Sequence, residues 1–145
     1  MSRPGDDAAA PIDLLGYLLK HAHLRFTALT DAALEPFGID SKDLGALRVL
    51  ADHEPRSQLQ VAQVLGVDRT TMVALLDALE GKGILTRRPA PDDRRRNVVE
   101  LSERGVQTYE AAVAAYREAE EAFLAALDEG GATQLRQALR ALIER

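Results

Sequence analysis

Three consecutive arginines, Arg94, Arg95 and Arg96, directly follow an aspartate, Asp93, in this 145-residue chain. A guanidinium presents five N–H donors in a flat fork that matches the oxygens of a phosphate group. Asp93 stands two residues before Arg95 and can hold that guanidinium in one rotamer through a charge-assisted hydrogen bond. The residue types and their spacing therefore predict an anion-binding tip in which one arginine is oriented by a carboxylate.

A second polar cluster begins at Asp68 and opens a leucine-rich stretch with helical spacing. Its hydroxyls and guanidinium suit base edges and phosphates, its methyl groups suit thymine methyls, and a helix N-terminus attracts phosphate. The predicted contacts are Arg69, Thr70, Thr71, Val73 and Ala74. Asp68 is expected to cap the helix, and Thr71 could instead only support that cap. Together the two clusters favour a protein that binds double-stranded DNA.

Both clusters need rigid elements to position them, and residues 58–80 have the spacing of a helix-turn-helix. Ser57 and Gln60 form a capping box that predicts a helix over Gln58–Leu65, which Gly66 ends. A second helix is predicted over Arg69–Glu80, with a buried stripe of Met72, Leu75, Leu76 and Leu79. Ser57 and Gln58 would lie near the phosphate backbone. An ordinary helical hairpin fits the same spacing.

The arginine tip is expected to lie on a β-hairpin. Gly81 and Gly83 stop the second helix, and short strands are predicted over Ile84–Arg88 and Val98–Leu101. Prolines and acidic residues in the connection 89–93 favour a turn. The hairpin would form a wing beside the helix-turn-helix.

Longer helices flank this central part. Periodic apolar residues predict a helix over Ile12–Phe37, and a helix over Lys42–Asp52 capped by Asp40 or Ser41. Ser102 is expected to cap a long helix whose apolar seam runs to Leu127. We expect Gly130 and Gly131 to turn the chain, and Thr133 to cap a final helix. The fold class is thus mostly α with a small β-hairpin wing: a six-helix winged helix-turn-helix.

Composition allows one core and excludes several function classes. With 46% hydrophobic residues, the chain predicts a single unit over residues 12–145 after a disordered tail over 1–11. The absence of cysteine excludes disulfides and thiol-based sensing. No signal peptide or membrane span is expected, so we predict a cytoplasmic protein.

The net charge of −5 at first argues against a polyanionic partner. Residues 57–97, however, hold seven basic and five acidic side chains, a local charge of +2, which leaves −7 for the rest. An acidic body with basic working ends would restrict DNA to one face. Ordinary scatter of charges accounts for the same numbers.

The chain resembles the MarR family of winged helix-turn-helix regulators. The resemblance is carried by Asp93-Arg94-Arg95 followed by Leu101-Ser102-Glu103-Arg104-Gly105, which fit the family's wing signature except that serine replaces threonine at Ser102. It implies a homodimer held by helices within 12–37 and 102–145, with DNA-binding lobes over 40–101. It also implies that Arg95 enters the minor groove and that Asp93 braces the wing. We expect the neighbouring Arg94 and Arg96 to touch phosphates. A repressor on a pseudo-palindromic operator is the expected function.

Family members commonly respond to small anionic or aromatic molecules, and the first predicted helix carries candidates for such an effector. Tyr17, His21 and Arg25 share one helical face, and Arg48 is a further candidate. Ordinary surface positions or contacts between subunits explain these residues equally well. We expect no cofactor, no metal and no catalysis, because no nucleophile and base pair or phosphate loop stands out. The alternative function is a winged-helix module for protein interaction or dimerisation that does not bind DNA.

Overall fold

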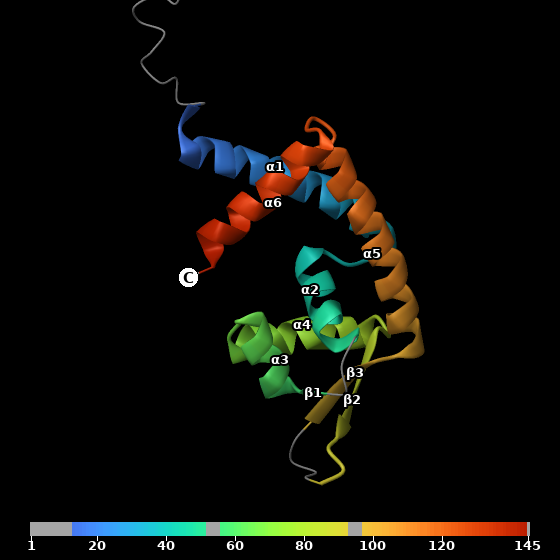
Figure 1. Ribbon diagram of the computed structural model, residues 1–145. Helices are drawn as coiled ribbons and strands as arrows, with labels where there is room; N and C mark the ends of the chain where they lie inside the picture. Colours follow the sequence, from blue (N-terminus) through green and yellow to red (C-terminus); the bar gives the residue numbers. More distant parts are fainter. Residues whose placement is uncertain (1–12, 52–55, 93–96, 145) are drawn as a thin grey trace, which may run out of the picture. The chain divides into compact units, whose positions relative to one another are not determined.

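The structure, a computed structural model, describes residues 13–51, 56–92 and 97–144 (Figure 1). Its elements, in chain order, are α1 (Leu15–Leu34), the short 3-10 helix η2 (Glu35–Phe37), α2 (Ser41–Ala51), β1 (Arg56–Ser57), α3 (Gln58–Leu65), α4 (Arg69–Gly81), β2 (Leu85–Pro89), β3 (Asn97–Leu101), α5 (Glu103–Leu124) and α6 (Glu129–Ile143). The mostly helical fold with a hairpin between α4 and α5 confirms the predicted class.

The chain forms two compact units, and α5 runs through both. One unit spans Ala33–Tyr116 and contains α2, α3, α4, the sheet and the first part of α5. The other joins the chain up to Ala32 with the chain from Arg117 onward, and so contains most of α1, the end of α5 and α6. We call them the central unit and the terminal unit.

The central unit has a continuous apolar core made by its helices and its sheet. The largest fully buried apolar side chains in it are Leu34, Leu47, Val61, Met72, Leu76, Leu79, Leu85 and Val99. Burying one such leucine or methionine stabilises the fold by roughly 1.5–3 kcal/mol. Three of the four residues in the predicted stripe of α4 are therefore in the core, and Leu75 packs against it half-buried.

The sheet has three antiparallel strands in the order β1-β3-β2. Strands β2 and β3 form the predicted hairpin, in register from Leu85 opposite Leu101 to Pro89 opposite Asn97. The additional strand β1, which the sequence analysis missed, places Arg56 opposite Val99 and Ser57 opposite Val98. It anchors the start of α3 directly to the wing.

The structure decides between the two predicted caps of α2 and corrects the predicted cap of α6. Asp40 rather than Ser41 caps α2, because the Asp40 carboxylate accepts from the Asp43 N–H at 2.9 Å while the Asp43 carboxylate accepts from the Asp40 N–H at 3.0 Å. The prediction that Thr133 caps α6 was wrong. Asp128 fills that role by accepting from the Gly131 N–H at 2.6 Å, so both glycines lie inside the helix.

The first and fifth helices are also shorter than expected. Helix α1 ends at Leu34, where Pro36 begins the 3-10 turn η2 and Gly38 closes it with a φ of 68°. Helix α5 ends at Leu124, so Leu127 lies in the connection to α6.

Within the terminal unit, an aromatic pair and an ion pair join the helices. The rings of Phe26 on α1 and Phe123 on α5 meet edge to face with centroids 5.2 Å apart. Arg136 on α6 pairs with Glu120 on α5 at 3.1 Å. Large apolar side chains nevertheless stay exposed on α1 and α6, including Leu15, Leu18, Leu19, Leu24, Leu139, Leu142 and Ile143.

Candidate nucleic-acid interface

The start of α4 is fixed by a side-chain cap. The Asp68 carboxylate accepts a hydrogen bond from the Thr71 N–H at 2.6 Å, as expected of a cap. This hydrogen bond lowers the pKa of Asp68 below its ordinary value. Arg69, Thr70 and Thr71 are exposed in the first turn that Asp68 fixes.

Helix α4 has one buried face and one exposed face. Met72, Leu76 and Leu79 face the core, whereas Val73 and Ala74 are exposed together with the first turn. The exposed face therefore offers a guanidinium, two hydroxyls and several methyl groups on a rigid helix. Those are the groups with which a recognition helix contacts base edges in the major groove.

The start of α3 carries the predicted capping box. The Ser57 hydroxyl accepts from the Gln60 N–H at 3.2 Å, and the Gln60 side chain accepts from the Ser57 N–H at 3.0 Å. The neighbouring Gln58 has a buried side-chain oxygen without a hydrogen-bond partner. Ser57 and Gln58 are thus fixed at the N-terminus of a helix, where backbone N–H groups favour a phosphate.

A groove of about 740 Å³ joins these elements. Four of the predicted DNA-contacting residues, Ser57, Gln58, Arg69 and Val73, line it together. Asn97, the first residue of β3, lines the same groove and was missed by the sequence analysis. Its place directly after the arginine run was the available signal.

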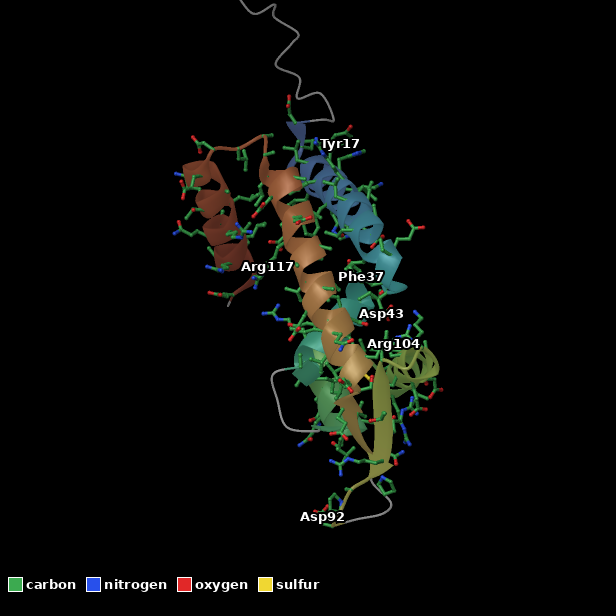
Figure 2. The ribbon with its side chains drawn as sticks, turned by 90° about the vertical axis from the view of Figure 1, so that its right-hand side faces the viewer. Tyr17, Phe37, Asp43, Asp92, Arg104 and Arg117 are labelled. Atoms are coloured by element: carbon green, nitrogen blue, oxygen red, sulfur yellow. The ribbon has the colours of Figure 1, made fainter. Side chains whose placement is uncertain are left out.

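The base of the wing is locked to the start of α5. The Ser102 hydroxyl accepts from the Gly105 N–H at 3.0 Å and donates to the Gly83 carbonyl at 2.6 Å, while the Ser102 N–H donates to the Ile84 carbonyl at 3.0 Å. A Cβ at Gly105 would lie 1.9 Å from the Ile84 carbonyl oxygen. The serine and glycine of the signature therefore hold α5 against the wing, and Figure 2 places Arg104 at this base and Asp92 at the far end.

Two arginines in the stem of the wing are already paired with acids. The Arg87 guanidinium lies 2.5 Å from the Asp77 carboxylate and 3.9 Å from that of Glu80, both on α4. Arg88 pairs with Glu100 on the opposite strand at 3.0 Å. These pairs, which the sequence analysis missed, reduce the positive charge that the stem offers to DNA.

The tip of the wing lies outside the described residues. It contains Asp93, Arg94, Arg95 and Arg96, so the bracing role of Asp93 and the minor-groove role of Arg95 stay predictions. Arg94 and Arg96 as phosphate contacts stay predictions for the same reason.

The candidate effector residues lie in both units. Tyr17 and His21 stack on the surface of α1 with ring centroids 3.9 Å apart, which agrees with their predicted shared face. Arg25 is exposed further along α1, and Arg48 is exposed on α2 in the central unit. A groove of about 550 Å³ between α5 and α6 is lined by other residues, among them Arg117, Glu120 and Arg136.

Metal-binding clusters and membrane-spanning helices are both absent from residues 13–51, 56–92 and 97–144. In these ranges, no three His, Asp or Glu side chains are grouped in a way that could hold a metal ion. No helix there has both the length and the apolar character needed to cross a bilayer.

Comparisons with known proteins agree with this geometry. A family model described as MarR matches residues 37–96. The HTH-type transcriptional repressor NicR of Pseudomonas putida is 29% identical over 153 aligned positions, which cover 99% of this chain and 96% of NicR.

Two solved structures have the same fold over nearly their whole length. A "probable transcriptional regulator" from Pseudomonas aeruginosa has a TM-score of 0.80 and 32% identity, covering 90% of this chain and 98% of its own. The transcriptional repressor CouR, solved on a 23-mer DNA duplex, has a TM-score of 0.80 and 32% identity, covering 92% of this chain and 94% of its own.

Proposed function

Because the chain belongs to the MarR family and is a DNA-binding transcriptional regulator, we propose that it acts in the cytoplasm as a homodimeric repressor on a pseudo-palindromic operator. The observation that carries the proposal is the groove in which Ser57, Gln58, Arg69 and Val73 meet beside the exposed face of α4. The proposal includes no catalytic step and no resident cofactor.

Helix α4 is proposed to enter the major groove of DNA. Arg69 and Thr70 would contact base edges, Val73 and Ala74 would contact thymine methyl groups, and Thr71 would support the first turn. Ser57 and Gln58 would contact phosphates from the start of α3. The exposure of the α4 residues and the fixed ends of both helices support this assignment.

The wing is proposed to reach the adjacent minor groove. Arg95 would enter that groove, oriented by Asp93, while Arg94 and Arg96 would contact phosphates. A narrow minor groove has an enhanced negative potential, which favours an inserted guanidinium. The antiparallel stem β2-β3, which leads to this tip, supports the proposal.

A second copy of the chain is proposed to cover the apolar surface of the terminal unit. Leu15 is 66% exposed and Leu142 is 71% exposed, and further leucines beside them on α1 and α6 are also exposed. Large apolar side chains exposed in this number on two helices of one unit favour an interface. In the dimer, two copies of α4 would enter successive major grooves about 34 Å apart.

A small anionic or aromatic effector is proposed to modulate DNA binding. Tyr17, His21 and Arg25 on α1 supply aromatic faces and a cation, and Arg48 supplies another cation. CouR from Rhodococcus jostii RHA1, with a TM-score of 0.76 and 24% identity over 93% of this chain and 95% of its own, was solved with p-coumaroyl-CoA. A loss of the mobility shift described next, on addition of a candidate molecule, would identify an effector.

The proposed contacts can be tested by a mobility shift with the intergenic DNA upstream of the protein's own gene. We expect a complex that weakens steeply as KCl is raised. Arg95→Ala should weaken binding strongly, and Arg69→Ala or Thr70→Ala should cost about 1–3 kcal/mol per lost base contact and relax sequence preference. Arg117→Ala, which removes the same charge from the exposed surface of α5, is the matched control. Equal affinity of Arg95→Ala and wild type would contradict the minor-groove role.

A further inference from the structure

Arg87 occupies a position in the sheet where an apolar residue would be expected. On β2 it lies opposite Val99, and Leu85, two residues earlier, lies opposite Leu101. Residues directly opposite each other in an antiparallel pair share a face of the sheet. The face that carries buried Leu85 and Val99 therefore also carries the Arg87 guanidinium, and Arg87 is directed toward the helices rather than into solvent.

The partners of Arg87 both belong to the recognition helix. Asp77 and Glu80 lie one turn apart on α4, at 2.5 Å and 3.9 Å from the guanidinium. Strand β2 is in direct contact with α4, as Figure 1 also shows. The proposed DNA contacts of α4 lie in its N-terminal half, so Arg87 attaches the wing to the other half of the same rigid element.

The burial of Arg87 argues against a direct contact with DNA. Its side chain is only 16% exposed, and its buried Nε atom has no hydrogen-bond partner. To reach a phosphate, the guanidinium would have to leave both carboxylates. Its position instead suits a link between two elements that bind different grooves.

The exposure of the acids argues against a mainly stabilising role. The Asp77 side chain is 59% exposed and that of Glu80 is 46% exposed. Ion pairs with such exposed partners typically contribute about 0–1 kcal/mol to the free energy of unfolding. The ion pairs can have a larger effect on the orientation of the wing relative to α4. Asp92 lies five residues beyond Arg87 and three beyond the end of β2, a reach of at most about 17 Å, so a hairpin rotation of about 10° would shift this end of the wing by up to about 3 Å.

We propose that Arg87 is a positioning residue for DNA binding: its ion pairs with Asp77 and Glu80 fix the wing relative to α4, so that α4 and the wing bind in register. The inference rests on the proposed wing contacts. Removing Arg87 should reduce only the part of the affinity that the wing supplies. Contacts made by α4 itself should persist.

The test uses the full-length protein and two duplexes. The long duplex carries the site that the wild-type protein selects from a random pool, and the short duplex lacks the flanking base pairs that the wings would reach. The ratio of the two affinities measures the wing contribution. For Arg87→Gln we expect this ratio to fall on the order of tenfold, with unchanged affinity for the short duplex, and Arg87→Lys to restore part of it.

Two further measurements separate positioning from other roles. In a background with Asp77→Asn and Glu80→Gln, Arg87→Gln should change the ratio little, because its partners are already gone; an undiminished effect there would show direct DNA contact and overturn the proposal. An equal loss on both duplexes together with a lower melting temperature would show a merely structural role and overturn it too. If the wild-type protein binds the long and the short duplex with equal affinity, the proposed wing contact with DNA is contradicted. That result is distinct from a failure of the Arg87 role, which would appear as a wild-type preference for the long duplex that Arg87→Gln leaves unchanged.

Discussion

The carboxylates of Asp43 and Asp68 each accept a hydrogen bond from a backbone N–H at the start of a helix. Their pKa values nevertheless move in opposite directions. Burial is the main cause that raises the pKa of Asp43, and the nearby Asp40 charge adds to it. Asp68 is fully exposed, and its hydrogen bond from the Thr71 N–H lowers its pKa. Ionisation is therefore penalised at Asp43, which bonds back to the N–H of the α2 cap Asp40, and favoured at Asp68, which is itself the cap of α4.

The variant Asp43→Asn should be at least as stable as wild type at pH 7. Because the folded-state pKa of Asp43 is raised, the cost of its charge is fully present above that pKa and disappears as the pH falls below the ordinary aspartate value. Denaturant unfolding at a series of pH values should show the advantage of Asn shrinking toward acid. A loss of stability that is equal at every pH would show that the charge is not penalised.

Asp68→Ala should have the opposite pH dependence. Because the folded-state pKa of Asp68 is lowered, its contribution is present above the ordinary aspartate pKa and is lost as the pH falls through the lowered folded-state value. The stability gap between wild type and Asp68→Ala should therefore close in acid. Asp68→Asn keeps a capping oxygen and serves as the control. A gap that widens in acid would contradict the capping role.

At the scale of elements, helices with local signals could be predicted from the sequence. Helix α3 has the predicted bounds because Ser57, Gln60 and Gly66 act within a few residues of one another. Strand β1 could not be predicted, since two residues carry no periodic pattern and the strand exists only by pairing with distant β3.

Two other features needed the structure for different reasons. The Arg87 partners lie seven and ten residues away on another element, so their identity depends on how β2 packs on α4. The cap of α6 was missed because paired glycines usually end a helix. At Gly131 a Cβ would lie 3.1 Å from the Asp128 carboxylate, so the glycine leaves room for the cap.

The close approach of α5 to the wing gives a prediction at this scale. Gly105→Ala places a methyl group against the Ile84 carbonyl, so α5 or β2 must shift. We expect a loss on the order of 2–4 kcal/mol in the free energy of unfolding.

The matched control is Gly45→Ala on α2, where no atom lies within 4 Å of the added carbon. That substitution should stabilise the protein by about 0.5–1 kcal/mol, because alanine suits a helix interior better than glycine. Thermal unfolding of both variants checks the pair. Equal effects would show that Gly105 is not in close contact with the wing in solution.

At the scale of the whole molecule, the charge available for DNA is concentrated in few places. Lys82 donates to the Gly38 carbonyl, and Arg87 and Arg88 pair with acids. In the proposed complex, Arg69 and the three arginines of the tip would then be the principal basic contacts in residues 57–97. In the proposed dimer of this protein, whose chain carries a net charge of −5, two copies of this small basic surface would act together on the polyanion.

Dimerisation can be tested through the exposed leucines of the terminal unit. Leu18→Asp combined with Leu142→Asp should give a monomer in sedimentation equilibrium, because a charge would have to be buried in the interface. DNA affinity should fall by at least about a hundredfold, since the two half-sites would no longer be bound together. Val64→Asp, on an apolar residue of α3 with 57% exposure, should remain a dimer. A dimeric Leu18→Asp, Leu142→Asp variant would place the interface elsewhere.

The lock between Ser102, Gly105 and the Ile84 carbonyl has a consequence for searches among genomes. Those two residues of the signature are occupied with internal hydrogen bonding and close packing. Other proteins that share them would share an architecture at the root of the wing, whatever their operators are. This half of the signature identifies the scaffold, and under the proposed contacts target sites would be inferred from residues such as Arg69 and Thr70.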